Sequence, residues 1–261
     1  MRTENWREAS INARNIVDLM ILLGRLSEAA EAAQQAIDYG QKSENLFNQM
    51  VSYAYLATVL HRQGQDASEA FLIAEQLQKR RQPDSPQLCS LPGFQYCAWL
   101  LDQTNSDISQ VIVRGEYGLN TTISLLDVAL HSLTLAIAYA KLEQFKQAEY
   151  YFHQAVAGTR KAGRIDHLVY FLIYRANFFL QQHQHEDEAR VLRDLTEARQ
   201  IIGRSDMKLY AVDYHLAMCR YYRLKQQPKE AKQHLEKSKV LIDVTGYYLR
   251  NAEFNALHSN K

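Results

Sequence analysis

The sequence predicts an all-α protein built from a stack of about six helix pairs, and three observations support this prediction. Alanines that open an amphipathic segment recur about every 40 residues. Glycines recur with a similar period, each shortly after such a segment. Only four prolines occur in 261 residues, so few positions interrupt a helical hydrogen-bond ladder. A stack in which each helix pair covers its neighbours explains such a repeat.

The repeating unit is clearest in the middle of the chain. In segment 145–162, Phe145, Ala148, Phe152 and Ala155 follow one another at spacings of three and four, which gives one apolar stripe on a helix. The preceding segment, 125–142, is apolar or small on nearly every side. Such a helix must be covered on more than one face. An amphipathic helix beside a covered helix is therefore the expected unit.

The same order returns along the chain, with a connector rich in Gly, Gln or Glu before the alanine that opens each second helix. The matched residues are Ala29, Ala70, Ala148, Ala189 and Ala231. One interval is about twice as long as the others, which predicts a degenerate unit between residues 85 and 120.

Helix-end signals agree with this period. Glycine ends a helix at low cost because it adopts positive φ freely, and one glycine follows each of five predicted second helices: Gly40, Gly118, Gly163, Gly203 and Gly246. Pro228 lies where a first-turn proline is tolerated, and Asp166 and Ser205 are expected N-caps.

The helix ranges follow in order. First helices are expected over 5–23, 47–63, 87–103, 124–142, 166–182 and 207–225. Second helices are expected over 26–39, 67–81, 107–117, 145–162, 186–202 and 229–245. The repeats then cover about 5–40, 47–81, 87–118, 124–163, 166–203 and 207–246 of a single domain, 1–261, with a C-terminal cap in 247–261. Three prolines near 82–92 and a loose connection before 124 allow a hinge there, but one continuous array is favoured.

The order of small and aromatic residues in Ala136, Tyr139, Ala148, Phe152 and Ala155 resembles a tetratricopeptide (TPR) repeat. The resemblance implies a right-handed α-α superhelix, or solenoid. The period of about 40 residues, rather than about 34, points to a variant with long helices.

From residue 91 onward the likeness is closer. The strings LPGFQYCAWLL, LLDVALHSLTLAIAYAKL, AGRIDHLVYFLIYRANFF and VTGYYLRNAEF are similar to the C-terminal TPR sensor region of bacterial NACHT/STAND-type NTPases. The resemblance implies a region that senses a ligand or partner. The sequence contains no G-x-x-x-x-G-K-[ST] loop, so the NTPase part is missing here. The chain is then either an excised sensor region or a free-standing relative.

Charge and composition argue against several other classes of protein. Thirty basic and 29 acidic residues nearly cancel, which argues against a dedicated nucleic-acid binder. No apolar run is long enough for a membrane span, and MRTENWREAS lacks the apolar stretch of a signal peptide. Cys89, Cys97 and Cys219 show no metal-type spacing. A cytoplasmic protein with reduced thiols is expected.

No catalytic, metal or cofactor site is expected. His183 and His185, with the acids that follow them, fall in a connector and are explained by a solvated turn. Asp127 and His131 lie four residues apart, which favours an ion pair or hydrogen bond over a general base. Cys97 is expected to pack in a helix interface. Nucleophile-elbow, H-E-x-x-H and dinucleotide motifs are all missing from the sequence.

Binding of a protein or peptide is the favoured function. In stacked arrays the first helices line the concave face. The small residue at the centre of each first helix sets its phase: Val17, Ala57, Cys97, Ala136, Ala176 and Cys219. This phase predicts the groove-facing residues Arg14, Asp18, Thr58, His61, Arg62, Asn177, Gln181, Asp213, Arg220 and Arg223. The alternative is an enzyme, or an enzyme-regulating subunit, with a small-molecule pocket near the irregular 82–124 region.

Overall fold

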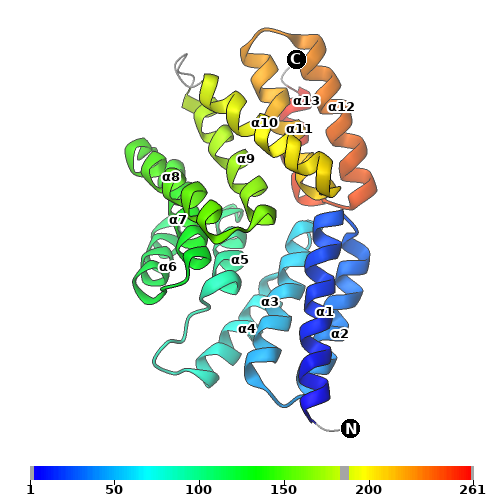
Figure 1. The fold of residues 1–261 in the computed structure, drawn as a ribbon, viewed down its shortest axis with the longest axis vertical. Coiled ribbons are helices and arrows are strands. Elements are labelled where there is room, and N and C mark those ends of the chain that lie inside the picture. The colour runs from blue at the N-terminus through cyan, green and yellow to red at the C-terminus, as the bar shows by residue number, and fades with distance from the viewer. Residues whose placement is uncertain (1–2, 183–187, 260–261) are drawn as a thin grey trace.

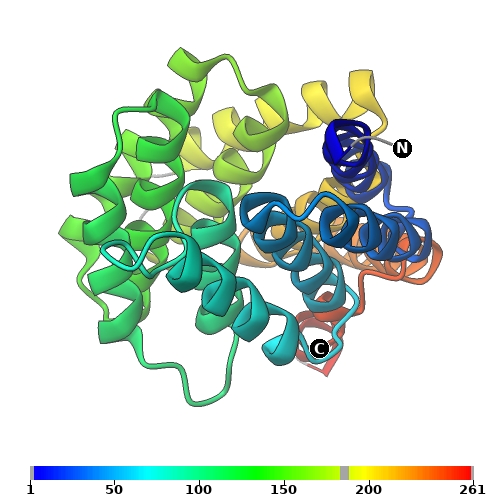
Figure 2. The same ribbon diagram turned by 90° about the horizontal axis from the view of Figure 1, so that it is seen from below.

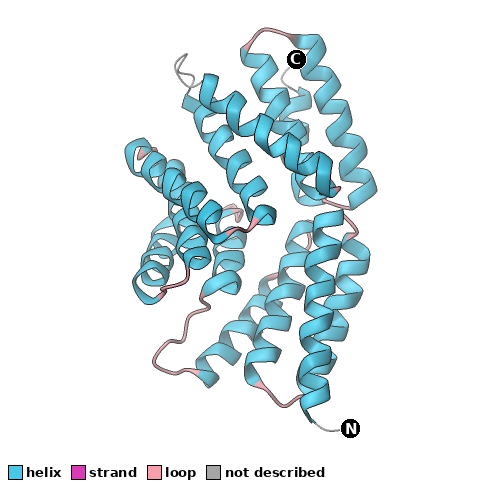
Figure 3. Ribbon diagram, viewed as in Figure 1, coloured by secondary structure: helices cyan, strands magenta, loops and turns pink. Residues whose placement is uncertain are grey.

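The computed structural model describes residues 3–182 and 188–259 of the chain. Within these residues the protein consists of thirteen α-helices and one 3₁₀ helix, and contains no strand (Figure 3). Successive helices pack against each other as adjacent pairs. The all-α prediction is confirmed.

Each described helix lies within a few residues of its predicted range. The N-terminal elements are α1 (Thr3–Leu23), α2 (Leu26–Lys42), α3 (Leu46–Arg62), α4 (Ser68–Arg81), α5 (Ser90–Leu101) and α6 (Ile108–Thr121). The central elements are α7 (Leu125–Lys141), α8 (Phe145–Ala162), α9 (Ile165–Gln182) and α10 (Glu188–Ser205). The C-terminal elements are α11 (Lys208–Leu224), α12 (Pro228–Thr245), η2 (Tyr248–Arg250) and α13 (Asn251–Ser259).

Local chemistry explains many helix ends. The side chains of Asn45, Asp107 and Ser124 each accept a hydrogen bond from a backbone N–H in the first turn of their helix. Gly163 and Gly246 end α8 and α12 with φ of 69° and 73°, as predicted for glycine C-caps. Pro228 begins α12, also as predicted.

Other predicted helix signals are wrong. Gly40, Gly118 and Gly203 lie inside helices rather than after them, and Ser205 ends α10 instead of capping α11. Asp166 lies in the first turn of α9, where its carboxylate accepts a hydrogen bond from Arg164 Nε at 3.0 Å. The glycine at position 118 serves packing, since a Cβ there would overlap the imidazole of His131.

The two ends of the chain share one hydrophobic core. A single buried cluster joins Val17 of α1 and Phe71 of α4 to Leu209 of α11 and Tyr247 before η2. Helix α1 contacts α11, and α3 contacts η2. In Figures 1 and 2 the blue N-terminal helices accordingly lie beside the orange and red C-terminal elements, across from the green α6–α8. The sequence did not predict this contact.

The irregular region contains a connection between α4 and α5 that is longer than most of the others. Helix α6 is nevertheless tied back to α4, because the guanidinium of Arg114 donates two hydrogen bonds to Glu75, of 2.7 and 3.1 Å. Arg114 also lies 4.6 Å from the ring centroid of Tyr96 on α5. This cation therefore links three helices around the connection.

None of the described helices combines the length and the apolar character that crossing a membrane requires.

Candidate functional site

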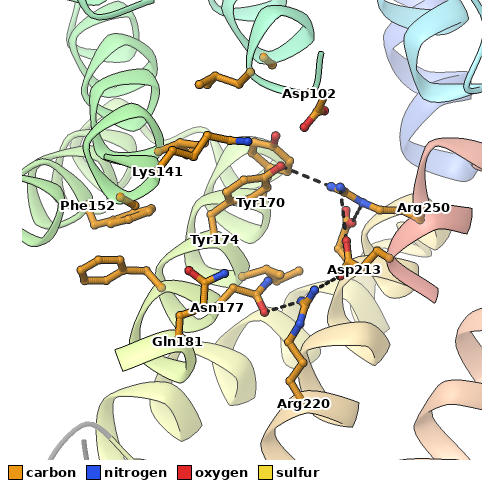
Figure 4. Close-up of a pocket in the computed structure, with 17 residues that line it drawn as sticks. Asp102, Lys141, Phe152, Tyr170, Tyr174, Asn177, Gln181, Asp213, Arg220 and Arg250 are labelled. Atoms are coloured by element: carbon orange, nitrogen blue, oxygen red, sulfur yellow. Dashed lines mark hydrogen bonds and ion pairs between the residues drawn. The ribbon is translucent and has the colours of Figure 1, made fainter. Parts of the chain in front are cut away.

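The candidate site is a pocket of about 350 Å³ between the first helices of successive pairs, which we call the central pocket (Figure 4). Helices α5, α7, α8, α9 and α11 line it, together with Arg250 of η2 and Glu253 of α13. Its volume falls within the range of small-ligand sites in proteins. The pocket therefore has room for a small molecule or for a few residues of a peptide.

One wall of the central pocket is apolar. Phe152 and Phe178 lie with their ring centroids 4.9 Å apart, and Ile173 and Leu101 are buried beside them. Phe152, Ile173 and Phe178 belong to the large buried cluster of the central helices, whereas Leu101 belongs to a smaller cluster formed by α5, α6 and α7. Packing between helices thus builds a rigid apolar surface against which a ligand can bury its own apolar groups away from water.

The opposite wall is polar and is held by ion pairs. Arg220 forms an ion pair with Glu253 at 2.7 Å and donates a hydrogen bond to Asn177 Oδ1 at 3.0 Å. Arg250 forms an ion pair with Asp213 at 2.5 Å and donates to the hydroxyl of Tyr174 at 3.4 Å. These contacts fix α9, α11 and the C-terminal cap around the pocket.

Asp102 closes the rim next to α3. Its Oδ2 lies 3.1 Å from Nε2 of His61. Burial raises the pKa of Asp102, but the contact with His61 and the nearby Arg250 outweigh burial, so the pKa lies below its ordinary value. Burial is also the main influence on His61 and lowers the pKa of its imidazole. A neutral imidazole beside a carboxylate is the expected state near neutral pH.

Asp213 is the most enclosed acid of the pocket. Burial raises the pKa of its carboxyl, and the Arg250 and Arg62 cations offset part of that shift. Its Oδ2 also accepts a hydrogen bond from the hydroxyl of Tyr247 at 3.5 Å. Each acid that lines the pocket thus faces a partner from the chain itself.

Hydrogen-bond donors remain for a ligand. Among the described residues Lys141 has no ion-pair or hydrogen-bond partner, and Figure 4 shows it extending from the end of α7 into the pocket. The amide nitrogen of Asn177 and the side chain of Gln181 are likewise without a described partner. One uncompensated cation with neutral donors beside it suits an acceptor group of negative charge.

The structure brings four of the ten predicted groove residues to the central pocket: Asn177, Gln181, Asp213 and Arg220. His61 and Arg62 lie just outside it, against Asp102 and Tyr247. Arg223 donates instead to the backbone carbonyl of Leu257.

The remaining three predicted residues do not line the pocket and have partners within the chain. Arg14 is buried and donates to the backbone carbonyl of Asn48 at 3.4 Å. Thr58 is buried and donates to its own helix. Asp18 accepts a hydrogen bond from Tyr55 at 2.7 Å, and burial raises the pKa of Asp18 to about 6.

Sequence reasoning missed Lys141, Tyr174, Arg250 and Glu253. One of them left a detectable signal: Lys141 follows Ala136 at the same spacing at which Gln181 follows Ala176. The equivalence of the two first helices therefore already placed both side chains on one face. Arg250 and Glu253 belong to the C-terminal cap, outside any repeat, and nothing in the pattern pointed to them.

Over residues 3–182 and 188–259 no three His, Cys, Asp or Glu side chains gather in a group that could hold a metal. Burial raises the pKa of Cys97 to about 12, which leaves an unreactive thiol. His183 and His185 lie outside the described residues.

The predicted contact between Asp127 and His131 is wrong. Asp127 instead accepts hydrogen bonds from Ser90 and Thr122, at 2.9 and 3.3 Å. Neither ring nitrogen of the buried His131 has a hydrogen-bond partner among the described residues. The imidazole instead packs against Gly118 of α6.

Comparison with protein-family models, with curated proteins and with solved structures found no match for this chain.

Proposed function

We propose that this chain is a non-catalytic binding module that holds a peptide segment of a partner protein in the central pocket. The observation that carries the proposal is the pairing of an apolar wall with the uncompensated charge of Lys141 and the free donors of Asn177 and Gln181. Peptides supply both matching features, since apolar side chains alternate with carbonyl and carboxylate acceptors.

We also propose that the helix pairs form a right-handed TPR-like solenoid of about six pairs, in one domain. The spacing of the opening alanines and the packing of adjacent helices support this. The likeness to sensor regions of bacterial signalling NTPases supports a sensor role in the cytoplasm. In that role, ligand binding at the pocket controls an effector elsewhere.

A small-molecule site is the second candidate. Ala98, Leu101 and Asp102 of the irregular 82–124 region line the central pocket, and the polar groups converge on a limited volume. This arrangement also suits an enzyme-regulating subunit that reads a metabolite. In both cases the ligand carries an apolar body and an acceptor group.

A selection from a displayed library of random peptides tests the proposal. We expect the wild-type protein to enrich sequences with an acidic group next to an apolar residue. Calorimetry should then show binding at least about ten-fold weaker in Lys141→Glu, because the substitution reverses a pocket charge that has no ion-pair partner among the described residues.

Lys146→Glu is the matched control, because Lys146 is exposed on α8 outside the pocket. Equal loss of affinity in both variants would indicate a general charge effect and would contradict the proposed site. Failure to enrich any peptide, with binding of apolar carboxylic acids to the same pocket, would support the small-molecule alternative.

A further inference from the structure

Helix α13 lies between two concave surfaces of the molecule. Glu253 lines the central pocket, whereas Phe254 and His258 line a second cavity of about 910 Å³ beside α12, which we call the lateral cavity. The same division occurs on α11, where Arg220 lines the central pocket and Arg223, one turn further along, lines the lateral cavity. Among the described residues the two cavities share no lining side chain. Helix α13 therefore separates them along α11.

Contacts from α13 occupy two arginines of α11. The carboxylate of Glu253 forms an ion pair with Arg220 at 2.7 Å, and the backbone carbonyl of Leu257 accepts a hydrogen bond from Arg223. Phe254 and Leu257 pack against the buried cluster to which α11 and α12 contribute. Both arginines are among the residues that the sequence predicts to face a ligand groove. A carboxylate, a carbonyl and apolar groups are the features that a bound peptide would offer to the same surface.

Helix α13 is held at the surface of the array. None of its residues from Asn251 to Ser259 is buried, whereas each of the helices α1 to α12 contains buried side chains. The side chains of Arg220 and Glu253 are 28% and 23% exposed, so solvent screens their ion pair. The preceding Tyr247 is fully buried and anchors the chain. Local unfolding of α13 therefore uncovers α11 without removing a buried side chain from the core.

We infer that α13 is an internal occupant of the peptide groove, which a longer peptide displaces when it extends from the central pocket along α11. The inference rests on the proposed function, because it takes the central pocket as the place where a peptide binds. With α13 in place, a volume of about 350 Å³ admits only a few residues. A peptide that continues past Arg220 meets Glu253 and competes with it for the guanidinium group.

This competition makes α13 an autoinhibitory element. A ligand that needs the α11 surface binds only the fraction of molecules in which α13 has left, so its apparent affinity falls by that fraction. A nine-residue helix is too short to be stable by itself in water, so the released segment unfolds. Displacement joins the central pocket to the lateral cavity. Helix α13 thus selects partner segments long enough to replace its contacts.

A synthetic copy of α13 added to the full chain tests whether the helix is an exchangeable occupant. The probe is an acetylated, amidated peptide with the sequence of residues 251–259. The double variant Phe254→Lys/Leu257→Lys releases the tethered helix, because it removes the two apolar contacts and places positive charge near Lys239 and Arg223. In the wild-type protein the tethered helix competes at a local concentration on the order of mM. We expect an NMR titration to show that the variant binds the probe at least about ten-fold more tightly than the wild type.

Further variants locate the exchange. Ala252→Lys/Ala256→Lys adds the same charges to the exposed side of α13 and should behave like the wild type. In the released variant, Arg220→Glu should weaken probe binding at least about ten-fold. A probe that carries Glu253→Lys should recover this loss, because the ion pair is then reversed rather than removed.

Hydrogen exchange distinguishes an exchangeable helix from a structural cap. In Phe254→Lys/Leu257→Lys the amides of α13 should lose protection, while the amides of α11 and α12 should exchange as slowly as in the wild type. Loss of protection in α11 and α12 together with α13 would show that α13 is a structural cap, and the inference would be wrong.

The titration can also overturn the inference. Equal affinity of the probe for the released variant and the wild type, or no binding to either, would show that α13 is not an exchangeable occupant. An equal gain in Ala252→Lys/Ala256→Lys would reveal a general charge effect and would count against it as well. The probe experiment does not involve Lys141, so unchanged peptide affinity in Lys141→Glu would contradict the proposed function in a separate measurement.

Discussion

Arg62 and Tyr247, 185 positions apart in the chain, are joined by a hydrogen bond of 2.7 Å from the guanidinium Nη1 to the phenolic oxygen. The guanidinium also lies 5.5 Å from the ring centroid of Tyr170 and 5.6 Å from that of Tyr247. One side chain at the end of α3 therefore contacts both α9 and the C-terminal segment. This contact connects the N-terminal helices to the residues behind the central pocket.

Tyr247→Phe should reduce the free energy of unfolding by about 1–3 kcal/mol. The hydroxyl is fully buried, and its removal leaves the Arg62 donor and the Asp213 acceptor without this partner. Urea unfolding measures the change. Tyr248→Phe is the neighbouring control, because Tyr248 is 48% exposed, and its effect should stay close to zero. Equal effects of the two variants would contradict the importance of the buried hydroxyl.

Gly118→Ala should destabilise the protein by about 1–3 kcal/mol, because the added methyl group would overlap the His131 ring. The loss should shrink when His131 is also replaced by Ala, since the space is then free, and a double-mutant cycle by thermal unfolding measures this coupling.

Gly203→Ala should instead stabilise the protein. A Cβ at Gly203 meets nothing within 4 Å, so helix propensity alone should stabilise α10 by up to about 1 kcal/mol. A stabilising Gly118→Ala would show that the imidazole of His131 moves freely and does not require this glycine.

Stability should fall as the pH is lowered from about 6.5 towards 4. His215 and His234 face each other with their Nδ1 atoms 2.8 Å apart. Burial is the main reason that the pKa of each imidazole falls to about 4. Lys237 and Arg199 contribute to both shifts, and His234 also contributes to the shift of His215. The unfolded chain binds protons at these imidazoles near the ordinary pKa of about 6.5. The unfolded state then holds more protons in this window, so acid favours unfolding.

The double variant His215→Gln/His234→Gln should flatten that dependence, because the amides can still hydrogen-bond but do not titrate. Denaturant unfolding at a series of pH values provides the measurement. His258→Gln, at an exposed position on α13, should leave the slope unchanged. An unaltered slope in the double variant would mean that other groups cause the acid sensitivity.

Asp194→Asn should cost about 3–5 kcal/mol of stability. Arg175 donates two hydrogen bonds to Asp194, of 2.7 and 2.8 Å, and both residues are at most 4% exposed. Breaking the pair leaves a buried cation without its anion, whereas Arg175→Met/Asp194→Leu should be much closer to neutral.

Asp166→Asn removes the charge of an exposed ion pair and is the comparison for the buried pair. Its partner Arg164 is nearly half exposed, so solvent screens the pair and the loss should stay below about 1 kcal/mol. Similar losses for Asp194→Asn and Asp166→Asn in chemical unfolding would contradict the role assigned to burial.

The helices themselves could be predicted from the sequence. The stripe from Phe145 to Ala155 is a relation between residues three and four apart, and such neighbours meet on any helix regardless of the rest of the fold. The end of α8 at Gly163 and the start of α12 at Pro228 are equally local. Asn177, Gln181, Asp213 and Arg220 were placed on one surface by the same reasoning, because equivalent first helices present equivalent faces.

Two glycines show what a local sequence pattern cannot predict. Gly163 ends a helix and Gly118 receives a ring from another helix, yet the two look alike in the sequence. The difference depends on His131, which comes from the next helix in the chain. A small residue is required in both places, for positive φ in one and for close approach in the other.

The sequence by itself determined which segments become helices and which faces they bury, since hydrophobic periodicity is a local property of the chain. The tertiary structure alone decided that the chain ends meet, that Arg250 and Glu253 complete the central pocket, and that Lys141 has no partner among the described residues. Contacts such as Arg62 with Tyr247 depend on how small rotations between successive helix pairs accumulate. The sequence of one repeat does not show the accumulated rotation, so the repeat pattern could not predict where the last helices would lie.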